Sequence, residues 1–132
     1  MSMAGRALGA YKNTQVGSRS PVELVAMLYD SLVRFLTQGR DALASGDLQA
    51  KRLAISGALG ALSELQNTLD LDKGGEMAKR LQALYAYIGS RIIEANLNRD
   101  VASLDEALKL VLPLREAWSD IAAAAPAAKA SA

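Results

Sequence analysis

Apolar residues recur along most of this chain at alternating steps of three and four, the spacing that places them on one face of an α-helix. The first such stripe begins at Val25 and ends near Leu43. Three more stripes follow, from Leu48 to Leu69, from Met77 to Ala95 and from Leu104 to Ile121. With the turn signals between them, the stripes predict four helices at about residues 21–45, 47–71, 75–98 and 101–123.

The ends of the first two predicted helices carry capping signals. Ser20 is followed by a proline and, three residues on, by Glu23, so its side chain can accept from the exposed N–H groups of a first helical turn. Gly46 suits the left-handed residue that ends a helix, and Asp47 can cap the helix that follows.

The later boundaries are less sharply marked. Residues 70–76 contain two glycines and are expected to form a turn. The last helix can start at Asp100 or at the capping box that begins at Ser103. Pro113 lacks an N–H group and crowds the preceding turn, so a kink is expected there although the apolar stripe continues past it.

Short connections between long helices force sequential neighbours to run in opposite directions. The predicted fold is therefore all-α, an antiparallel up-down four-helix bundle over residues 20–124. Residues 1–19 hold three glycines and no acidic side chain, and we expect them to form a flexible, loosely ordered or short-helical N-terminal arm. Residues 125–132 follow the last stripe with small side chains, and a disordered tail is expected.

Composition removes most enzyme classes. The 132 residues include no Cys and no His, so thiol nucleophiles, histidine acid–base catalysis and the usual zinc sites are absent. No catalytic residue, metal site or cofactor is predicted, and the chain is not expected to be an enzyme. The 15 Lys and Arg residues balance 14 Asp and Glu residues, which argues against a nucleic acid partner.

The longest stretch free of charged side chains runs from Leu53 to Ser63, far short of the ~20 apolar residues that a membrane-spanning helix needs. Direct insertion into a membrane is therefore not expected. The N-terminal segment also lacks the apolar core of a signal peptide, because Ala7 to Tyr11 is short and contains Gly9. We expect a cytoplasmic protein.

Several helices carry more apolar residues than a bundle stripe needs. Second rows accompany the stripes, for example at Met27, Ile93 and Leu112. They fit either a wide core or a groove for an amphipathic partner helix. The small residues of the second helix, including Gly57 and Gly60, predict a close approach of another backbone, either within the bundle or from a partner.

Three segments of the chain resemble the flagellar secretion chaperones that bind flagellin, the FliS family. The first combines residues 10–16, AYKNTQV, with residues 20–30, SPVELVAMLYD. The second joins KGGE at 73–76 to LYAYI at 84–88. The third is RIIEANLNRD at 91–100, followed by REAW at 115–118. The ordered set covers residues 10–121.

The resemblance implies a helical bundle that binds the disordered C-terminal region of flagellin, prevents premature polymerisation and assists delivery to the flagellar type III export apparatus. Its implied partners are flagellin and a component of the export gate. In this family the N-terminal segment can cover part of the apolar groove and give way to the client. The residues that match motif positions, and so are candidates for partner binding, are Tyr11, Gln15, Val16, Leu24, Leu28, Tyr29, Tyr85, Tyr87, Ile88 and Trp118.

A second hypothesis is a self-associating structural or regulatory bundle that uses the same apolar rows. Such a module would form oligomers without a client, whereas a chaperone would form a defined complex with one.

Overall fold

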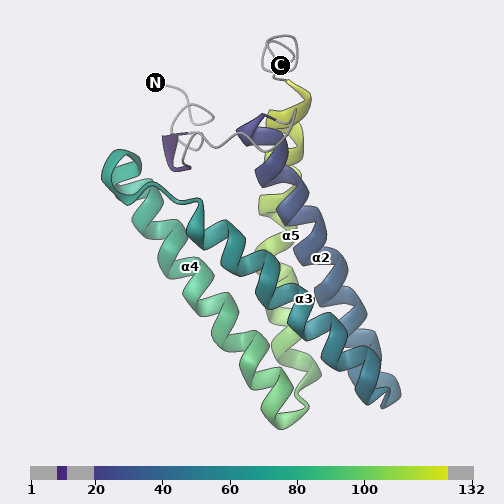
Figure 1. Ribbon diagram of the computed structural model, residues 1–132. Coiled ribbons are helices and arrows are strands. Elements are labelled where there is room, and N and C mark those ends of the chain that lie inside the picture. The colour runs from purple at the N-terminus through teal and green to yellow at the C-terminus, as the bar shows by residue number, and fades with distance from the viewer. Residues whose placement is uncertain (1–8, 12–19, 125–132) are drawn as a thin grey trace.

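The structure is a computed structural model that describes residues 9–11 and 20–124 (Figure 1). It contains four long helices: α2 (Pro21–Ser45), α3 (Leu48–Asn67), α4 (Leu71–Asn98) and α5 (Val101–Ala123). Each helix runs antiparallel to the one before it, so the start of α2 and the end of α5 lie at the same end of the molecule (Figure 1). The predicted all-α, antiparallel four-helix bundle is confirmed. The predicted tail at 125–132 and most of the predicted arm lie outside the described residues.

The first two helices begin with the predicted caps. The Ser20 hydroxyl accepts from the backbone N–H of Glu23 at 3.3 Å, and Asp47 accepts from the N–H of Ala50 at 3.1 Å. Gly46 ends α2 with a left-handed φ of 79°, a conformation that costs glycine nothing because it has no Cβ.

The connection between α3 and α4 differs from the expectation. Helix α3 ends at Asn67, four residues before the predicted boundary at 71. Asp70 then caps a new helical turn through its carboxylate, so α4 begins at Leu71 within the segment expected to be a turn. Gly75 interrupts this helix with φ 54° and ψ −136°, a conformation that other residues rarely adopt. The second glycine of the segment therefore provides the sharp change of direction.

The start of α5 is at Asp100, which accepts from the backbone N–H of Ala102 at 3.1 Å. The alternative start at Ser103 falls inside the helix. Helix α5 continues through Pro113 to Ala123.

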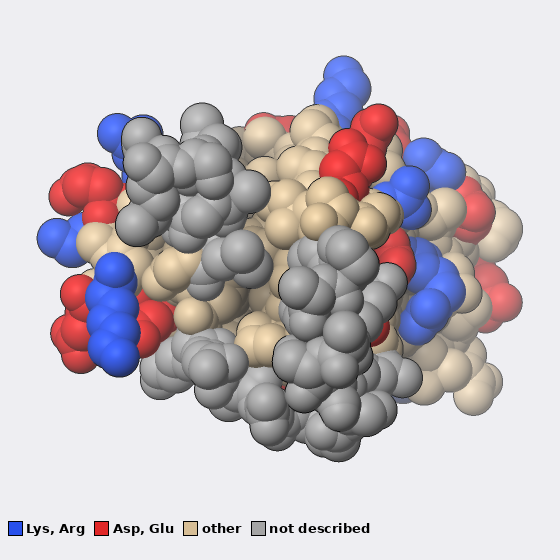
Figure 2. Space-filling model, turned by 90° about the horizontal axis from the view of Figure 1, so that it is seen from above, with Lys and Arg blue, Asp and Glu red and all other residues tan. Residues whose placement is uncertain are grey.

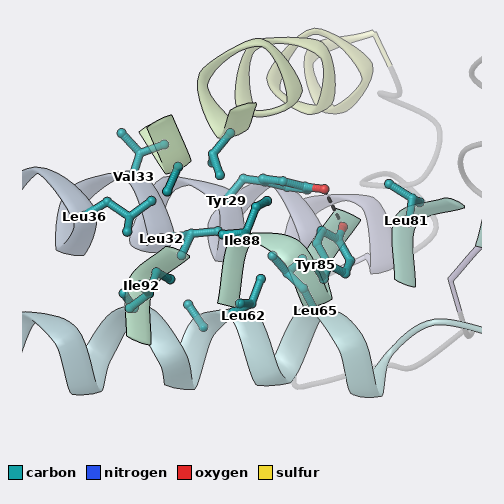
Figure 3. Close-up of a cluster of buried hydrophobic side chains, with 14 of the residues drawn as sticks. Tyr29, Leu32, Val33, Leu36, Leu62, Leu65, Leu81, Tyr85, Ile88 and Ile92 are labelled. Carbon is teal, nitrogen blue, oxygen red and sulfur yellow. Dashed lines mark hydrogen bonds between the residues drawn. The ribbon is translucent and has the colours of Figure 1, made fainter. Parts of the chain in front are cut away.

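Helix α2 packs most extensively against α3 and α5, while α4 covers the remaining side of the bundle between those two. Large side chains of α2 and α4 meet across the centre, where Leu32 and Ile88 are fully buried (Figure 3). The apolar stripes therefore converge on one continuous core. Within the described ranges, no helix is both long and apolar enough to cross a membrane.

Candidate functional site

An aromatic cluster joins four parts of the chain near the end of the bundle where α2 begins. It consists of Tyr11 from the arm, Tyr29 from α2, Tyr85 from α4 and Trp118 from α5, and each is less than 10% exposed. The Tyr11 ring meets Trp118 edge to face, with centroids 5.3 Å apart, and the Tyr29 ring lies almost parallel to Trp118 at 6.5 Å. These are favourable geometries for aromatic pairs, so the cluster ties the arm to three helices.

The three tyrosine hydroxyls of this cluster form a chain of hydrogen bonds. The Tyr85 hydroxyl lies in the middle and is bonded to the hydroxyls of both Tyr11 and Tyr29. Figure 3 shows the bond between Tyr29 and Tyr85 in the core. Burial raises the pKa of all three phenols above their ordinary value, because the charged form would lose its hydration. They are therefore neutral groups whose polar atoms are satisfied by one another.

The backbone of the arm is held beside the connection between α3 and α4. The carbonyl oxygen of Ala10 accepts from the N–H of Asp70 at 2.8 Å, and Tyr11 forms an isolated antiparallel bridge with Leu69. A Cβ added to Gly74 would lie 2.9 Å from the Cα of Ala10, which is closer than real Cβ atoms approach other atoms. The glycine therefore leaves room for the backbone of Ala10 at this point.

The remaining motif residues are found in different environments. Ile88 is fully buried in the core, whereas Leu24 and Leu28 on α2 are half-buried. Tyr87 is 45% exposed and its hydroxyl donates to Oε2 of Glu106 at 2.5 Å. Gln15 and Val16 lie outside the described residues. The structure thus gathers four of the eight described candidates in one cluster and places the other four in the core or at the surface.

Polar contacts join α4 to α5 beside Tyr87. The Nε atom of Arg91 lies 2.9 Å from Oε1 of Glu106, and its guanidinium also donates to the hydroxyl of Ser103 at 2.5 Å. The same hydroxyl donates to Asp100 at 2.8 Å. The Tyr87 hydroxyl is one member of this network, which fixes its side chain against α5.

The second apolar rows divide between core and surface. Val22, Tyr29, Val33 and Tyr85 are buried, which agrees with a wide core. Other large apolar side chains are more than 40% exposed, and these are Met27, Leu48, Leu53, Leu71, Tyr87, Ile93, Leu97 and Leu112. Seen from the end where α2 begins and α5 ends, the surface between the undescribed residues is mostly uncharged, with charged side chains around its edge (Figure 2).

A groove that the sequence patterns did not indicate lies between α2 and α3. It has a volume of about 570 Å³ and is lined by Phe35, Gln38, Asp41, Ala42, Ser45, Asp47, Ala50, Leu53 and Ala54. Leu53 borders this groove and is 69% exposed, and it belongs to no apolar stripe or family motif from which its exposure could have been predicted.

A family model described as "Flagellar protein FliS" matches residues 4–125. The chain belongs to this family. A flagellar secretion chaperone FliS of Salmonella typhimurium is 38% identical over 107 residues, which cover 80% of this chain and 79% of the relative. The FliSB chaperone of Pseudomonas aeruginosa is 34% identical over 81% of this chain and 85% of its own. The FliS chaperone of Campylobacter jejuni is 32% identical over 87% of this chain and 90% of its own.

The resemblance inferred from the sequence motifs is thereby confirmed, and the match includes all of the described residues. The FliS relatives are named as chaperones, which is a non-enzymatic role. The aromatic cluster and the docked segment 9–11 lie within the matched residues.

Proposed function

We propose that this FliS-family chain is a cytoplasmic export chaperone for flagellin. It binds the disordered C-terminal region of flagellin, prevents premature polymerisation, and assists delivery to the flagellar type III export apparatus through a component of the export gate. The observation that carries the proposal is the family match over residues 4–125.

The surface of the bundle supports a role in binding an apolar client. Met27, Ile93 and Leu97 are large apolar residues with at least 41% of their surface exposed. Exposed apolar side chains on several helices are typical of surfaces that bind a partner helix. Within the motif set, Leu24, Leu28 and Tyr87 are the residues that a client can reach without rearrangement of the bundle.

The buried motif residues have a different part in this proposal. Tyr29, Tyr85 and Trp118 line the place that Tyr11 occupies, so a client meets them after segment 9–11 has moved away. In the proposed mechanism this segment covers the site in the absence of client. Gln15 and Val16 belong to the same covering segment in the family motif.

A disordered client must be held by many contacts. Ordering its backbone costs about 1–2 kcal/mol per residue, while each buried Leu or Ile side chain returns roughly 1.5–3 kcal/mol. Binding therefore requires apolar anchors spread over a long surface. The distribution of exposed apolar residues over all four helices meets that requirement.

The proposal is tested by calorimetric titration of the full chain with a peptide from the C-terminal region of flagellin from the same cell. We expect saturable binding at micromolar peptide. Leu28→Ala should weaken binding at least severalfold, because it removes an apolar anchor from the motif face. Gln49→Ala, which shortens an exposed polar side chain of similar size on α3, is the control and should leave the affinity unchanged.

Light scattering on the same samples separates the proposal from self-association. A chaperone gives a monomer alone and one defined complex with the peptide. No saturable heat, together with oligomers formed by the chain alone, would replace the proposal with the self-associating bundle.

A further inference from the structure

Segment 9–11 lies in a slot whose shape and hydrogen-bonding groups select which residues can bind there. The slot is defined by Leu69, Asp70 and Gly74 on one side and by Tyr29, Tyr85 and Trp118 on the other. The first group contacts the backbone of the segment, and the second receives the side chain of Tyr11. The two groups impose separate requirements on whatever lies there.

The backbone side of the slot requires a small residue followed by a residue that can pair with Leu69. The N–H of Asp70 donates to the carbonyl of Ala10, and Tyr11 pairs with Leu69 in an antiparallel bridge. Ala10 is 0% exposed, and its Cα lies against Gly74, so a larger side chain at this position has no solvent to enter. In segment 9–11 itself, Gly9 is helical and Ala10 lies in a turn, so only Tyr11 pairs in the manner of a strand.

The aromatic side of the slot requires a hydroxyl as well as a ring. Tyr85 and Tyr29 are each 0% exposed, and Tyr11 is 7% exposed, so the hydroxyl chain lies in an apolar and almost dry environment. An apolar ring in place of Tyr11 would remove one of the two hydrogen-bond partners of the Tyr85 hydroxyl. A buried polar group that loses a partner is destabilised, so the slot favours a phenol over a phenyl ring.

We propose that this slot is a tyrosine-selective subsite for a peptide segment, and that the client segment which replaces residues 9–11 carries a small residue followed by tyrosine there. The inference rests on the proposed chaperone function, because it names the chemistry by which the same site recognises its client. It adds a sequence requirement that general apolar binding does not impose. A segment without this dipeptide leaves the slot to Ala10 and Tyr11 and binds elsewhere on the bundle.

The test uses analogues of the two side chains. Tyr11→Ala in the full chain empties the aromatic part of the slot, and the probes are p-cresol, which matches tyrosine, and toluene, which matches phenylalanine. We expect p-cresol to bind roughly tenfold more tightly than toluene and to raise Tm correspondingly more, because it restores a buried hydrogen bond. Equal affinity of the two probes would show that the slot selects only for an apolar ring and not for a hydroxyl group, and it would overturn the proposal.

A second variant keeps the test valid if Tyr11→Ala does not fold. Tyr11→Phe retains the ring and removes the hydroxyl, so we expect Tm to fall and cleavage after Lys12 by trypsin to accelerate relative to the parent chain. An unchanged Tm and cleavage rate would contradict the proposed requirement for a hydroxyl. Peptides LGAYKN and LGAFKN, added to the Tyr11→Ala variant, extend the comparison to a backbone, and the tyrosine peptide should bind more tightly.

These outcomes can be separated from the outcome of the flagellin titration. A chain that binds the flagellin peptide but does not distinguish p-cresol from toluene keeps its proposed function and loses the tyrosine requirement. A chain that prefers p-cresol but gives no saturable binding of flagellin retains a tyrosine-selective slot and loses its proposed client.

Discussion

Two residues in this bundle adopt the left-handed conformation that ends a helix, and they differ in how well they suit it. Gly46 ends α2 with φ 79°, and Arg99 ends α4 with φ 52° and ψ 41°. The Cβ of a non-glycine residue is crowded by the neighbouring carbonyl in this conformation, which costs roughly 1–2 kcal/mol. Arg99 is therefore a strained position that the surrounding connection keeps in place.

Replacing Arg99 with glycine is expected to stabilise the protein by about 1 kcal/mol, because the relief of strain exceeds the added freedom of the unfolded chain. Urea unfolding followed by circular dichroism measures the change. Arg99→Ala is the matched control, since it shortens the side chain but keeps the Cβ, and it should give little gain. A similar gain for both variants would assign the effect to the arginine side chain instead of the backbone.

At the scale of whole helices, the two glycines inside α3 have different surroundings. A Cβ on Gly57 would lie 2.6 Å from the ring of Phe35, so this glycine accommodates the close packing of α2 on α3. At Gly60, no described atom lies within 4 Å of the position that a Cβ would take. The expected close approach of another backbone is therefore not found at either glycine, whereas Gly57 shows the alternative, tight packing within the bundle, against a side-chain ring.

This difference predicts opposite results for two similar substitutions. Gly60→Ala should stabilise the protein by about 0.5–1 kcal/mol, the usual advantage of alanine over glycine in a helix interior. Gly57→Ala should lose that advantage or destabilise, because the Phe35 ring must move. Thermal unfolding of the two variants measures whether each substitution raises or lowers the stability. Destabilisation by Gly60→Ala would reveal a close neighbour of that residue.

Helix starts could be predicted from the sequence because their signals are local. Ser20, Asp47 and Asp100 each accept a backbone N–H two or three residues ahead. The end of α3 could not be predicted, since Leu69 continues the apolar stripe. The N–H of Asp70 donates to Ala10, a partner distant in sequence, so the contact that follows this helix end has no local signal.

The candidate site was predictable only in part for the same reason. Family motifs marked Tyr11, Tyr29, Tyr85 and Trp118, but their meeting in one cluster depends on the packing of four separate segments. Leu48 belongs to an apolar stripe and yet is 52% exposed, because it is the first residue of α3 and lies at the end of the bundle.

On the scale of the whole molecule, the hydroxyl chain links stability to alkaline pH. The pKa of Tyr11, Tyr29 and Tyr85 is raised by burial in the folded state, whereas an unfolded phenol ionises near pH 10. Below about pH 10 the phenols are neutral in both states, and their contribution to stability is fully present. As pH rises further, the unfolded chain releases protons that the folded protein retains, so stability falls.

We therefore expect the free energy of unfolding to decrease above about pH 10, by up to about 1.4 kcal/mol per pH unit for each of the three phenols. Urea titrations at a series of pH values measure the slope. Absorbance at 295 nm should show that three of the four tyrosines ionise only when the protein unfolds. Tyr11→Phe should reduce the dependence of the free energy of unfolding on pH by the contribution of one phenol. Ionisation of all four tyrosines before the protein unfolds would contradict the buried cluster.

The position of Tyr11 also has a consequence for the order in which the protein is made and folded. Its ring contacts Trp118, and its hydroxyl contacts Tyr85, so its binding place does not exist until all four helices have been synthesised. Closing contacts of such large sequence separation is slow compared with forming helices. Residues 9–11 are made before the four helices and yet are consequently among the last described residues to become buried, so every newly made molecule passes through a stage in which the tyrosine slot is open.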